Sequence, residues 1–115
     1  MTQPTDGRVL LLGSEGMGRG DEGLGLTILG NFLKTLVGNP LRPDRIVCWN
    51  AGVKLLAGNS PVVGALQDLE GVGVEILACK TCVEHFGLQG KLVAGEVSSM
   101  PIISDLLVRS DVLAV

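Results

Sequence analysis

Residues 74–82 read VEILACKTC, an apolar run of strand length that ends in two cysteines spaced three residues apart. Residues 83–86 continue as a helix would, so this stretch is typical of a buried strand, a tight turn and an opening helix. Open α/β folds place their chemistry at the carboxyl edge of the sheet, where such a strand ends. We therefore expect Cys79 and Cys82 at that edge, within reach of each other on one helical face.

The same alternation of strand and helix runs along the whole chain. Apolar runs predict five strands, at residues 8–13, 45–50, 74–78, 92–94 and 112–115. Helical periodicity and helix-start residues predict helices at residues 22–37, 51–57, 60–70, 79–86 and 99–109. Strands that alternate with helices predict an α/β fold, namely a three-layer α/β/α sandwich with a mainly parallel five-stranded sheet. The sequence stops inside the last of these strands, so we expect a buried C-terminus.

Composition limits the classes of protein to which the chain can belong. Its 115 residues suit one domain, spanning residues 1–115, and an apolar share of 46% argues against disorder. The net charge is −3 and no basic cluster is present, which argues against nucleic acid or an anionic membrane surface as a partner. No apolar run approaches the roughly 20 residues of a membrane span.

Residues 1–6 read MTQPTD and have neither the basic nor the apolar region of a signal peptide. The expected location is therefore the cytoplasm, where the three cysteines would be reduced.

The two cysteines of the C-x-x-C motif are the most reactive groups in the sequence. A thiol at the start of a helix has a lowered pKa, and Lys80 adds a positive charge, so we predict that Cys79 attacks a sulfur donor and that Cys82 resolves the product. One alternative is that both cysteines merely pack beneath the helix. Another is a zinc site of Cys79, Cys82 and His85, which lacks a fourth ligand. We expect no metal and no cofactor.

Polar residues at the ends of the neighbouring strands form a candidate substrate-binding rim. The loop after the first strand contains Arg19, Gly20 and Asp21, and its backbone amides are suited to holding an anion. Asn50 and Lys54 follow the second strand, and Thr81 lies between the two cysteines. The alternative is that the loop is a tight turn with a helix cap, that Asn50 caps a helix and that Lys54 lies in solvent.

Four stretches, in this order, resemble the DsrE-like sulfur-relay superfamily and, within it, the C-terminal domain of YedF-type "sulfurtransferase-like selenium metabolism" proteins. They are MGRGDE (17–22), NAGVKL (50–55), CKTC (79–82) and GL (87–88) through KLVAGEVS (91–98). The resemblance implies a three-layer sandwich that forms homo- or hetero-oligomers. It also implies that Cys79 carries a persulfide received from a TusA-type partner. Many YedF proteins carry a TusA-like domain ahead of this one; here the donor is expected on another chain.

The leading hypothesis is a cytoplasmic sulfur or selenium carrier, similar to a sulfurtransferase, that uses the C-x-x-C thiols to accept and pass on sulfane sulfur. The expected donor is a TusA-type protein or a small sulfane-sulfur compound, and the chain is expected to form a homo-oligomer. The alternatives are a dithiol redox protein, although the Trp-Cys-Gly-Pro-Cys context of thioredoxins is missing, and a non-catalytic subunit that binds a small ligand or a partner. Residues 20–25 also resemble hydrogenase-maturation endopeptidases, but the only histidine, His85, lies in the wrong context for that function.

Overall fold

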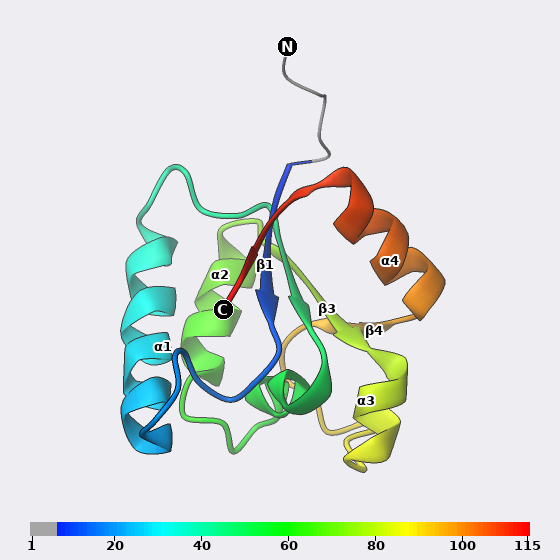
Figure 1. The fold of residues 1–115 in the computed structure, drawn as a ribbon, viewed down its shortest axis with the longest axis horizontal. Helices are drawn as coiled ribbons and strands as arrows, with labels where there is room; N and C mark the ends of the chain where they lie inside the picture. The colour runs from blue at the N-terminus through cyan, green and yellow to red at the C-terminus, as the bar shows by residue number, and fades with distance from the viewer. Residues whose placement is uncertain (1–6) are drawn as a thin grey trace.

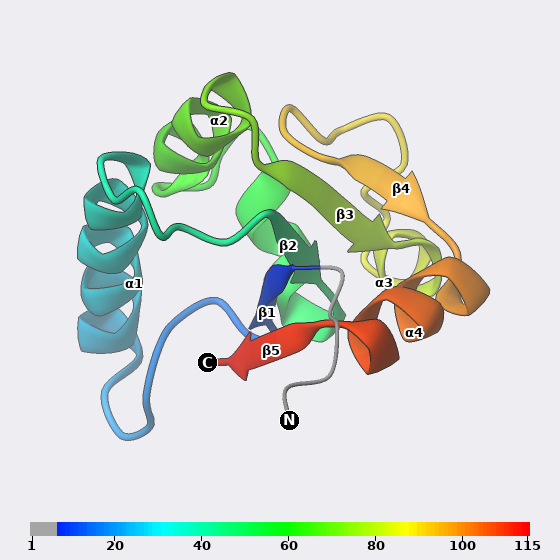
Figure 2. The ribbon, with the colours of Figure 1, turned by 90° about the horizontal axis from the view of Figure 1, so that it is seen from above.

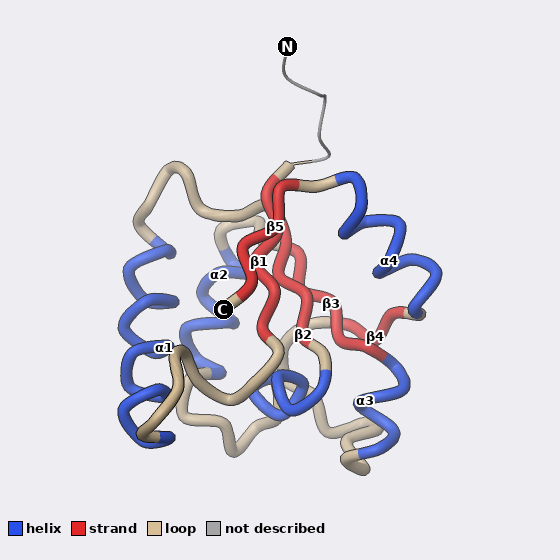
Figure 3. Tube along the Cα trace, viewed as in Figure 1, coloured by secondary structure: helices blue, strands red, loops and turns tan. Residues whose placement is uncertain are grey.

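In a computed structural model, which describes residues 7–115, five strands form one all-parallel sheet in the order β4-β3-β2-β1-β5 (Figures 1 and 3). The strands are β1 (Arg8–Leu12), β2 (Arg45–Cys48), β3 (Glu75–Cys79), β4 (Glu96–Ser98) and β5 (Asp111–Ala114). The helices are α1 (Glu22–Val37), the 3₁₀ helix η1 (Asn50–Leu56), α2 (Val63–Gly71), α3 (Lys80–His85) and α4 (Met100–Arg109). Residues 1–6, on which the expectation about a signal peptide rests, lie outside the described part.

The sheet is the middle layer of three. Helices α1 and α2 cover one face and α4 covers the other (Figure 2). Successive side chains of a strand point to opposite faces. Leu10 and Cys48 accordingly belong to the large core beneath α1 and α2, whereas Val9 and Val47 belong to a smaller core beneath α4. The predicted three-layer α/β/α sandwich is confirmed. Within residues 7–115, no helix is long and apolar enough to cross a membrane.

Helix α1 has the bounds that the sequence predicts, because both of its ends are locally encoded. The Asp21 side chain accepts a hydrogen bond from the Leu24 amide at 2.8 Å and so caps the first turn. Glu22 places negative charge in that turn, and Gly38 follows the last residue of the helix.

Two expectations about element bounds are wrong. The fourth strand is not at residues 92–94 but at Glu96–Ser98, where it pairs with the end of β3. The apolar residues 92–94 instead form a loop that packs against the core. Ala94 is buried, and Leu92 makes an isolated antiparallel bridge with Ala57. Helix α2 begins at Val63 rather than at residue 60, because Ser60 accepts the Val63 amide in a preceding turn.

The expectation of a buried C-terminus is also wrong: Val115 is only partly buried. All four residues of β5 are exposed, because β5 is an outer strand of the sheet and pairs only with β1 among the described strands. The apolar composition of β5 therefore reflects a surface that residues 7–115 leave uncovered.

Candidate functional site

The two sulfurs of the C-x-x-C motif lie at the carboxyl edge of the sheet, as predicted, but they differ in exposure. Cys79 is the last residue of β3 and only 2% exposed, packed with Val9, Val47 and Ile103 beneath α4. Cys82 lies one helical turn later in α3 and is partly exposed. The structure thus presents the Cys82 sulfur, rather than the Cys79 sulfur, to solvent.

The Cys82 sulfur accepts a hydrogen bond from the backbone of η1, the 3₁₀ helix that follows β2. The Asn50 amide, at the start of η1, donates a hydrogen bond to Cys82 Sγ at 3.0 Å. Asn50 has a left-handed backbone, with φ of 51°, and its Oδ1 accepts the Ala51 amide at 2.8 Å. Asparagine tolerates this conformation better than most residues, because its short polar side chain bonds locally. The conformation of Asn50 therefore aims its N–H at the thiol.

Burial and two neighbouring residues act on the pKa of the Cys82 thiol. Burial raises the pKa, the hydrogen bond from the Asn50 amide lowers it, and the hydrogen bond with Cys79 and the charge on Cys79 raise it further. The net effect is a pKa above the ordinary value for cysteine. The Asn50 amide is thus the contact that favours the thiolate, and Cys82 packs against the small core cluster that contains Cys79.

The third cysteine has a different environment. Cys48 is fully buried in the core beneath α1 and α2, and burial raises the pKa of its thiol to about 12. Such a thiol is inert at neutral pH, because its thiolate is the reactive form.

The glycine-rich loop after β1 places the predicted residues Arg19, Gly20 and Asp21 around an open cavity of about 620 Å³. Ala51 also lines this cavity, so the loop lies beside the start of η1, next to the residue that bonds Cys82. Asp21 is engaged in capping α1. The loop therefore serves as the helix cap that the alternative interpretation describes, and it also borders the thiol-bearing edge of the sheet.

Lys54 and Thr81 are placed differently from one another. Lys54 Nζ lies 3.6 Å from Glu15 Oε1 and 4.4 Å above the centre of the Phe86 ring, beside a separate cavity of about 220 Å³. Thr81 is exposed on α3 between the two cysteines. The structure thus ties Lys54 into an ion pair with the loop after β1.

A metal centre finds no support in the described part of the chain, where no cluster of three ligand-type side chains is arranged for a metal ion. His85, the third member of the zinc alternative, instead packs edge-on against Phe86, with ring centres 4.9 Å apart.

The contact that sequence reasoning missed is the one between Asn50 and Cys82. The sequence pointed to Asn50 as a polar rim residue, whereas the structure uses its backbone amide. The signal was an asparagine directly after a buried strand, a residue type enriched in the left-handed conformation. The partner of the amide, 32 positions away in the sequence, depends on the packing of α3 against η1.

Comparisons with known proteins identify the fold. No family model matches the sequence, and no curated protein matches it. Solved structures match over nearly the whole chain, among them the following three. MTH1491 from Methanobacterium thermoautotrophicum, a protein of unknown function, is 21% identical with a TM-score of 0.65, and the match covers 96% of this chain and 100% of that one.

The protein ychN from E. coli is 19% identical with a TM-score of 0.64, and the match covers 94% and 97% of the two chains. BT1422 from Bacteroides thetaiotaomicron, a conserved protein of unknown function, is 20% identical with a TM-score of 0.61, and the match covers 94% of each chain. These likenesses concern the fold alone. The chain shares its α/β fold with these three proteins, in agreement with the fold class that the sequence predicts.

Proposed function

We propose that this chain is a carrier of sulfane sulfur, or of selenium, in which Cys82 receives the transferred atom and Cys79 is the second thiol. The observation that carries the proposal is the hydrogen bond from the Asn50 amide to Cys82 Sγ. The amide aimed at this partly exposed sulfur offsets part of the rise in its pKa and so favours the thiolate, which is the nucleophile in sulfur transfer. The proposal includes a reducing cytoplasmic setting and the narrower relationship to YedF-type domains.

The transfer is a displacement at sulfur. The Cys82 thiolate attacks the terminal sulfur of a donor persulfide, R–S–SH, and the donor's S–S bond breaks. The donor leaves as the thiolate RS⁻, and Cys82 becomes the persulfide Cys82–S–SH. A TusA-type protein, or a small persulfide or polysulfide, would supply the donor.

Two routes release the carried sulfur. In the first, the thiolate of an acceptor attacks the terminal sulfur of Cys82–S–SH, and Cys82 returns to the thiolate. In the second, the Cys79 thiolate attacks Cys82 Sγ, expels HS⁻ and forms a Cys79–Cys82 disulfide. That disulfide returns to the dithiol by two-electron reduction with an external dithiol reductant. The packing of Cys82 against the cluster that contains Cys79, three residues away in the sequence, favours the second route.

Intact mass measurement after incubation with inorganic polysulfide tests the proposal. We expect the mass of added sulfur on the wild type, localised to Cys82 by peptide mapping, and none at that position in Cys82→Ser. Cys79→Ser is expected to keep the persulfide longer, because the internal release route is missing. Cys48→Ala is the matched control and should load normally. Absence of sulfur on Cys82, or loading of Cys79 in its place, would overturn the proposal.

The contact between the two thiols also suits a second function, that of a dithiol redox protein without sulfane transfer. The two functions differ in what the protein exchanges. A redox protein would oxidise to the Cys79–Cys82 disulfide and be reduced again by a dithiol partner without any added mass. A carrier would show the persulfide before the disulfide.

A further inference from the structure

A small cavity opens between the segments that follow the carboxyl ends of β1, β2 and β3. Its polar and aromatic lining comprises Glu15, Lys54, Asn59, Ser60 and Phe86. Its volume of about 220 Å³ lies below the roughly 300–1,000 Å³ of sites for drug-sized ligands. The cavity therefore suits a small molecule, and it lies at the edge of the sheet where open α/β folds bind ligands.

The two charged side chains of this cavity form an ion pair that no hydrogen bond closes. Lys54 Nζ lies 3.6 Å from Glu15 Oε1, whereas charge-assisted hydrogen bonds are about 2.7–2.9 Å long. The Lys54 and Glu15 side chains are 42% and 54% exposed, so their mutual attraction is weak. Both charges thus keep hydrogen-bonding capacity for a ligand, the ammonium as donor and the carboxylate as acceptor.

Phe86 holds the Lys54 ammonium at the cavity independently of Glu15. The centre of the Phe86 ring lies 4.4 Å from Lys54 Nζ, which is a cation–π distance, and the ring itself packs edge-on against His85. Glu15 is exposed and stands on the loop between β1 and α1. The Glu15 carboxylate can therefore turn toward a ligand while Lys54 stays in place.

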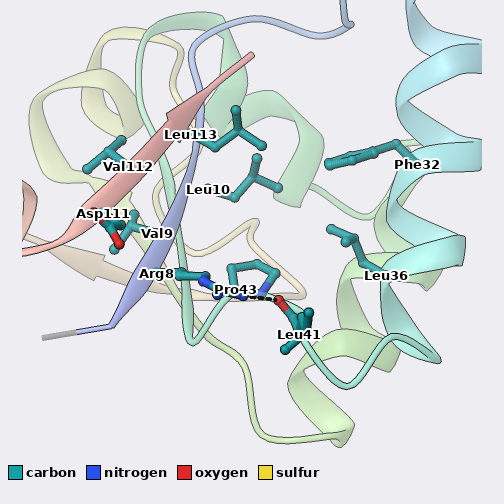
Figure 4. A pocket seen from close by; sticks show the side chains of 10 residues that line it. All are labelled: Arg8, Val9, Leu10, Phe32, Leu36, Leu41, Pro43, Asp111, Val112 and Leu113. Carbon is teal, nitrogen blue, oxygen red and sulfur yellow. Dashed lines mark hydrogen bonds between the residues drawn. The ribbon is translucent and has the colours of Figure 1, made fainter. Parts of the chain in front are cut away.

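The larger hollow between α1 and β5 has no comparable pair of charges. That hollow, of about 510 Å³, is lined mainly by apolar side chains (Figure 4). Arg8 and Asp111 also line it, but Arg8 reaches toward Leu41 and donates a hydrogen bond to the Leu41 carbonyl oxygen at 3.2 Å. Adjacent opposite charges are thus a feature of the smaller cavity.

A ligand that enters the ion pair of Lys54 and Glu15 must satisfy both charges. A simple carboxylate would pair with Lys54 and leave Glu15 without its partner, and a simple amine would do the reverse. An α-amino acid carries an ammonium and a carboxylate on one carbon atom, so it exchanges one ion pair for two. We propose that the cavity binds a small α-amino acid as its zwitterion, with the carboxylate on Lys54 and the ammonium on Glu15.

The remaining lining of the cavity sets the kind of amino acid that fits. It is apolar and comes from Leu26, Leu55, Ala57, Pro61 and Leu88. Such walls favour a short apolar or sulfur-bearing side chain over a charged one, because a charge there would lose its hydration without gaining a partner.

The cavity lies about one helical turn from the Cys82 thiol. Helices η1 and α3 meet at two points: the Asn50 amide contacts Cys82 Sγ, and four residues further along each segment Lys54 Nζ contacts the Phe86 ring. Residues four apart on a helix have Cβ atoms about 5–6 Å apart. The side chain –CH₂–S–SH of an amino-acid persulfide spans a comparable distance.

The position of the cavity therefore names the sulfur donor, a step that rests on the proposed function. The donor is the persulfide of a free thiol amino acid such as cysteine. The Cys82 thiolate attacks its terminal sulfur, the S–S bond of the donor breaks, and the amino acid leaves as its thiolate while Cys82 becomes the persulfide. Lys54 and Glu15 hold the amino-acid end throughout, so they position the donor and take no part in the bond changes.

Calorimetric titration with unreactive analogues tests the binding step. S-methyl-L-cysteine has a methyl group where cysteine persulfide has its terminal SH, so it cannot transfer sulfur. We expect it to bind the wild type with a Kd of about 1 mM or below. Methylthiopropionate lacks the ammonium and methylthioethylamine lacks the carboxylate, and each should bind about tenfold more weakly or worse, because one charge of the pair is left unsatisfied.

Variants of the two charged residues locate the binding. Lys54→Met and Glu15→Gln should each weaken binding of S-methyl-L-cysteine by about tenfold. Lys34→Met is the matched control, since Lys34 is exposed on α1 and does not line the cavity, and it should bind as the wild type does. Urea unfolding checks that the fold is intact, and the half-exposed ion pair should contribute little to the midpoint.

The rate at which Cys82 gains sulfur separates the donor assignment from the carrier function. With cysteine persulfide below saturation, Lys54→Met and Glu15→Gln should load Cys82 about tenfold more slowly than the wild type. With inorganic polysulfide, which has no amino-acid group, the same variants should load within about twofold of the wild type.

Each result bears on a different step. Absence of saturable S-methyl-L-cysteine binding, or equal binding of the three analogues, overturns the zwitterion site. Selective binding together with equal loading from cysteine persulfide in every variant overturns the donor assignment, and loading from polysulfide then leaves the carrier function standing. A protein that binds S-methyl-L-cysteine selectively but gains sulfur from neither donor supports the zwitterion site and contradicts the proposed function.

Discussion

Asn50 is the only residue other than glycine with a positive φ in the described part of the chain. Single residues held in such a conformation persist where the surrounding structure requires it, and they cluster at functional sites. Here the conformation has a visible consequence, because it directs the Asn50 amide at Cys82 Sγ. The backbone conformation of Asn50 thus determines whether Cys82 receives this hydrogen bond.

Substitution of Asn50 tests this link. Asn50→Gly should keep the left-handed backbone and the amide hydrogen bond, so alkylation of Cys82 by iodoacetamide should stay within about twofold of the wild type. Asn50→Val should abandon that conformation, since a β-branched residue there is strained by about 1–2 kcal/mol. Without the amide the pKa of Cys82 rises further, the thiolate fraction near neutral pH falls, and alkylation slows several-fold.

The measurement is the rate of Cys82 alkylation against pH, followed by mass spectrometry in a Cys79→Ser background. In that background no charge can form at position 79, and the serine hydroxyl is common to both Asn50 variants, so the remaining difference between them belongs to the amide. Equal pH profiles for the glycine and valine variants would show that the Asn50 amide does not tune the thiol.

At the scale of elements, η1 reaches Cys82 because it lies unusually close to the end of β1. A Cβ at Gly52, within η1, would meet the backbone carbonyl oxygen of Leu12. The Trp49 amide donates to the same carbonyl at 3.2 Å, which fastens the end of β2 to the end of β1. Glycine at position 52 therefore sets how closely η1 packs against the sheet, and with it the position of Asn50.

Gly52→Ala should consequently destabilise the protein, by about 2 kcal/mol or more, because neither the methyl group nor the strand backbone can move aside cheaply. Gly30→Ala is the matched control. It adds the same methyl group in the middle of α1, where the nearest atom is Val62 Cγ1 at an ordinary 3.5 Å, and it should stabilise by about 0.5–1 kcal/mol. Urea unfolding of both variants measures the difference, and equal losses would show that η1 tolerates a looser approach to β1.

The elements that the sequence predicts well are those whose pattern is local. The central strands are buried on both faces and read as continuous apolar runs, and α1 has a cap residue at its start and a glycine after its end. Strand β4 is not predicted because it is short and largely exposed and has the sequence Glu-Val-Ser. The more apolar residues 92–94 pack as a loop. The exposure of β5 also escapes, since an apolar strand looks the same whether its own chain or another one covers it.

The candidate site follows the same division. The motif and its place at the carboxyl edge of the sheet follow from strand, turn and helix in sequence order. The sequence pattern does not indicate which of the two sulfurs is exposed, because Cys79 is covered by α4, which comes from a distant part of the chain. The ion pair of Lys54 with Glu15 is likewise a long-range contact that no local pattern encodes.

At the scale of the whole molecule, the two faces of the sheet are covered unequally. The core beneath α1 and α2 holds most of the buried side chains, whereas the core beneath α4 centres on Val9, Val47, Cys79 and Ile103. The cysteine pair of the proposed function thus lies at the smaller core, beneath α4, whereas most of the buried side chains that stabilise the fold lie in the larger core, beneath α1 and α2. Cys48 belongs to the larger core, so its ionisation reports on the stability of the whole fold.

Alkaline pH should destabilise the protein through Cys48. Its thiol has a pKa of about 12 in the folded state, against about 8.5 in an unfolded chain, so only the unfolded state loses the proton in between. The stability from the neutral thiol is therefore complete below about pH 8.5 and declines as pH rises toward 12, by at most about 1.4 kcal/mol per pH unit. The raised pKa of Cys82 acts in the same direction, and the chain has no tyrosine to titrate in this range.

Urea unfolding at pH 7, 9, 10 and 11 should show the wild type losing stability faster than Cys48→Ala, which starts lower because of the cavity but lacks the buried thiol. Parallel curves for the two proteins would mean that Cys48 ionises in the folded state, and that the core beneath α1 and α2 opens more readily than its packing indicates.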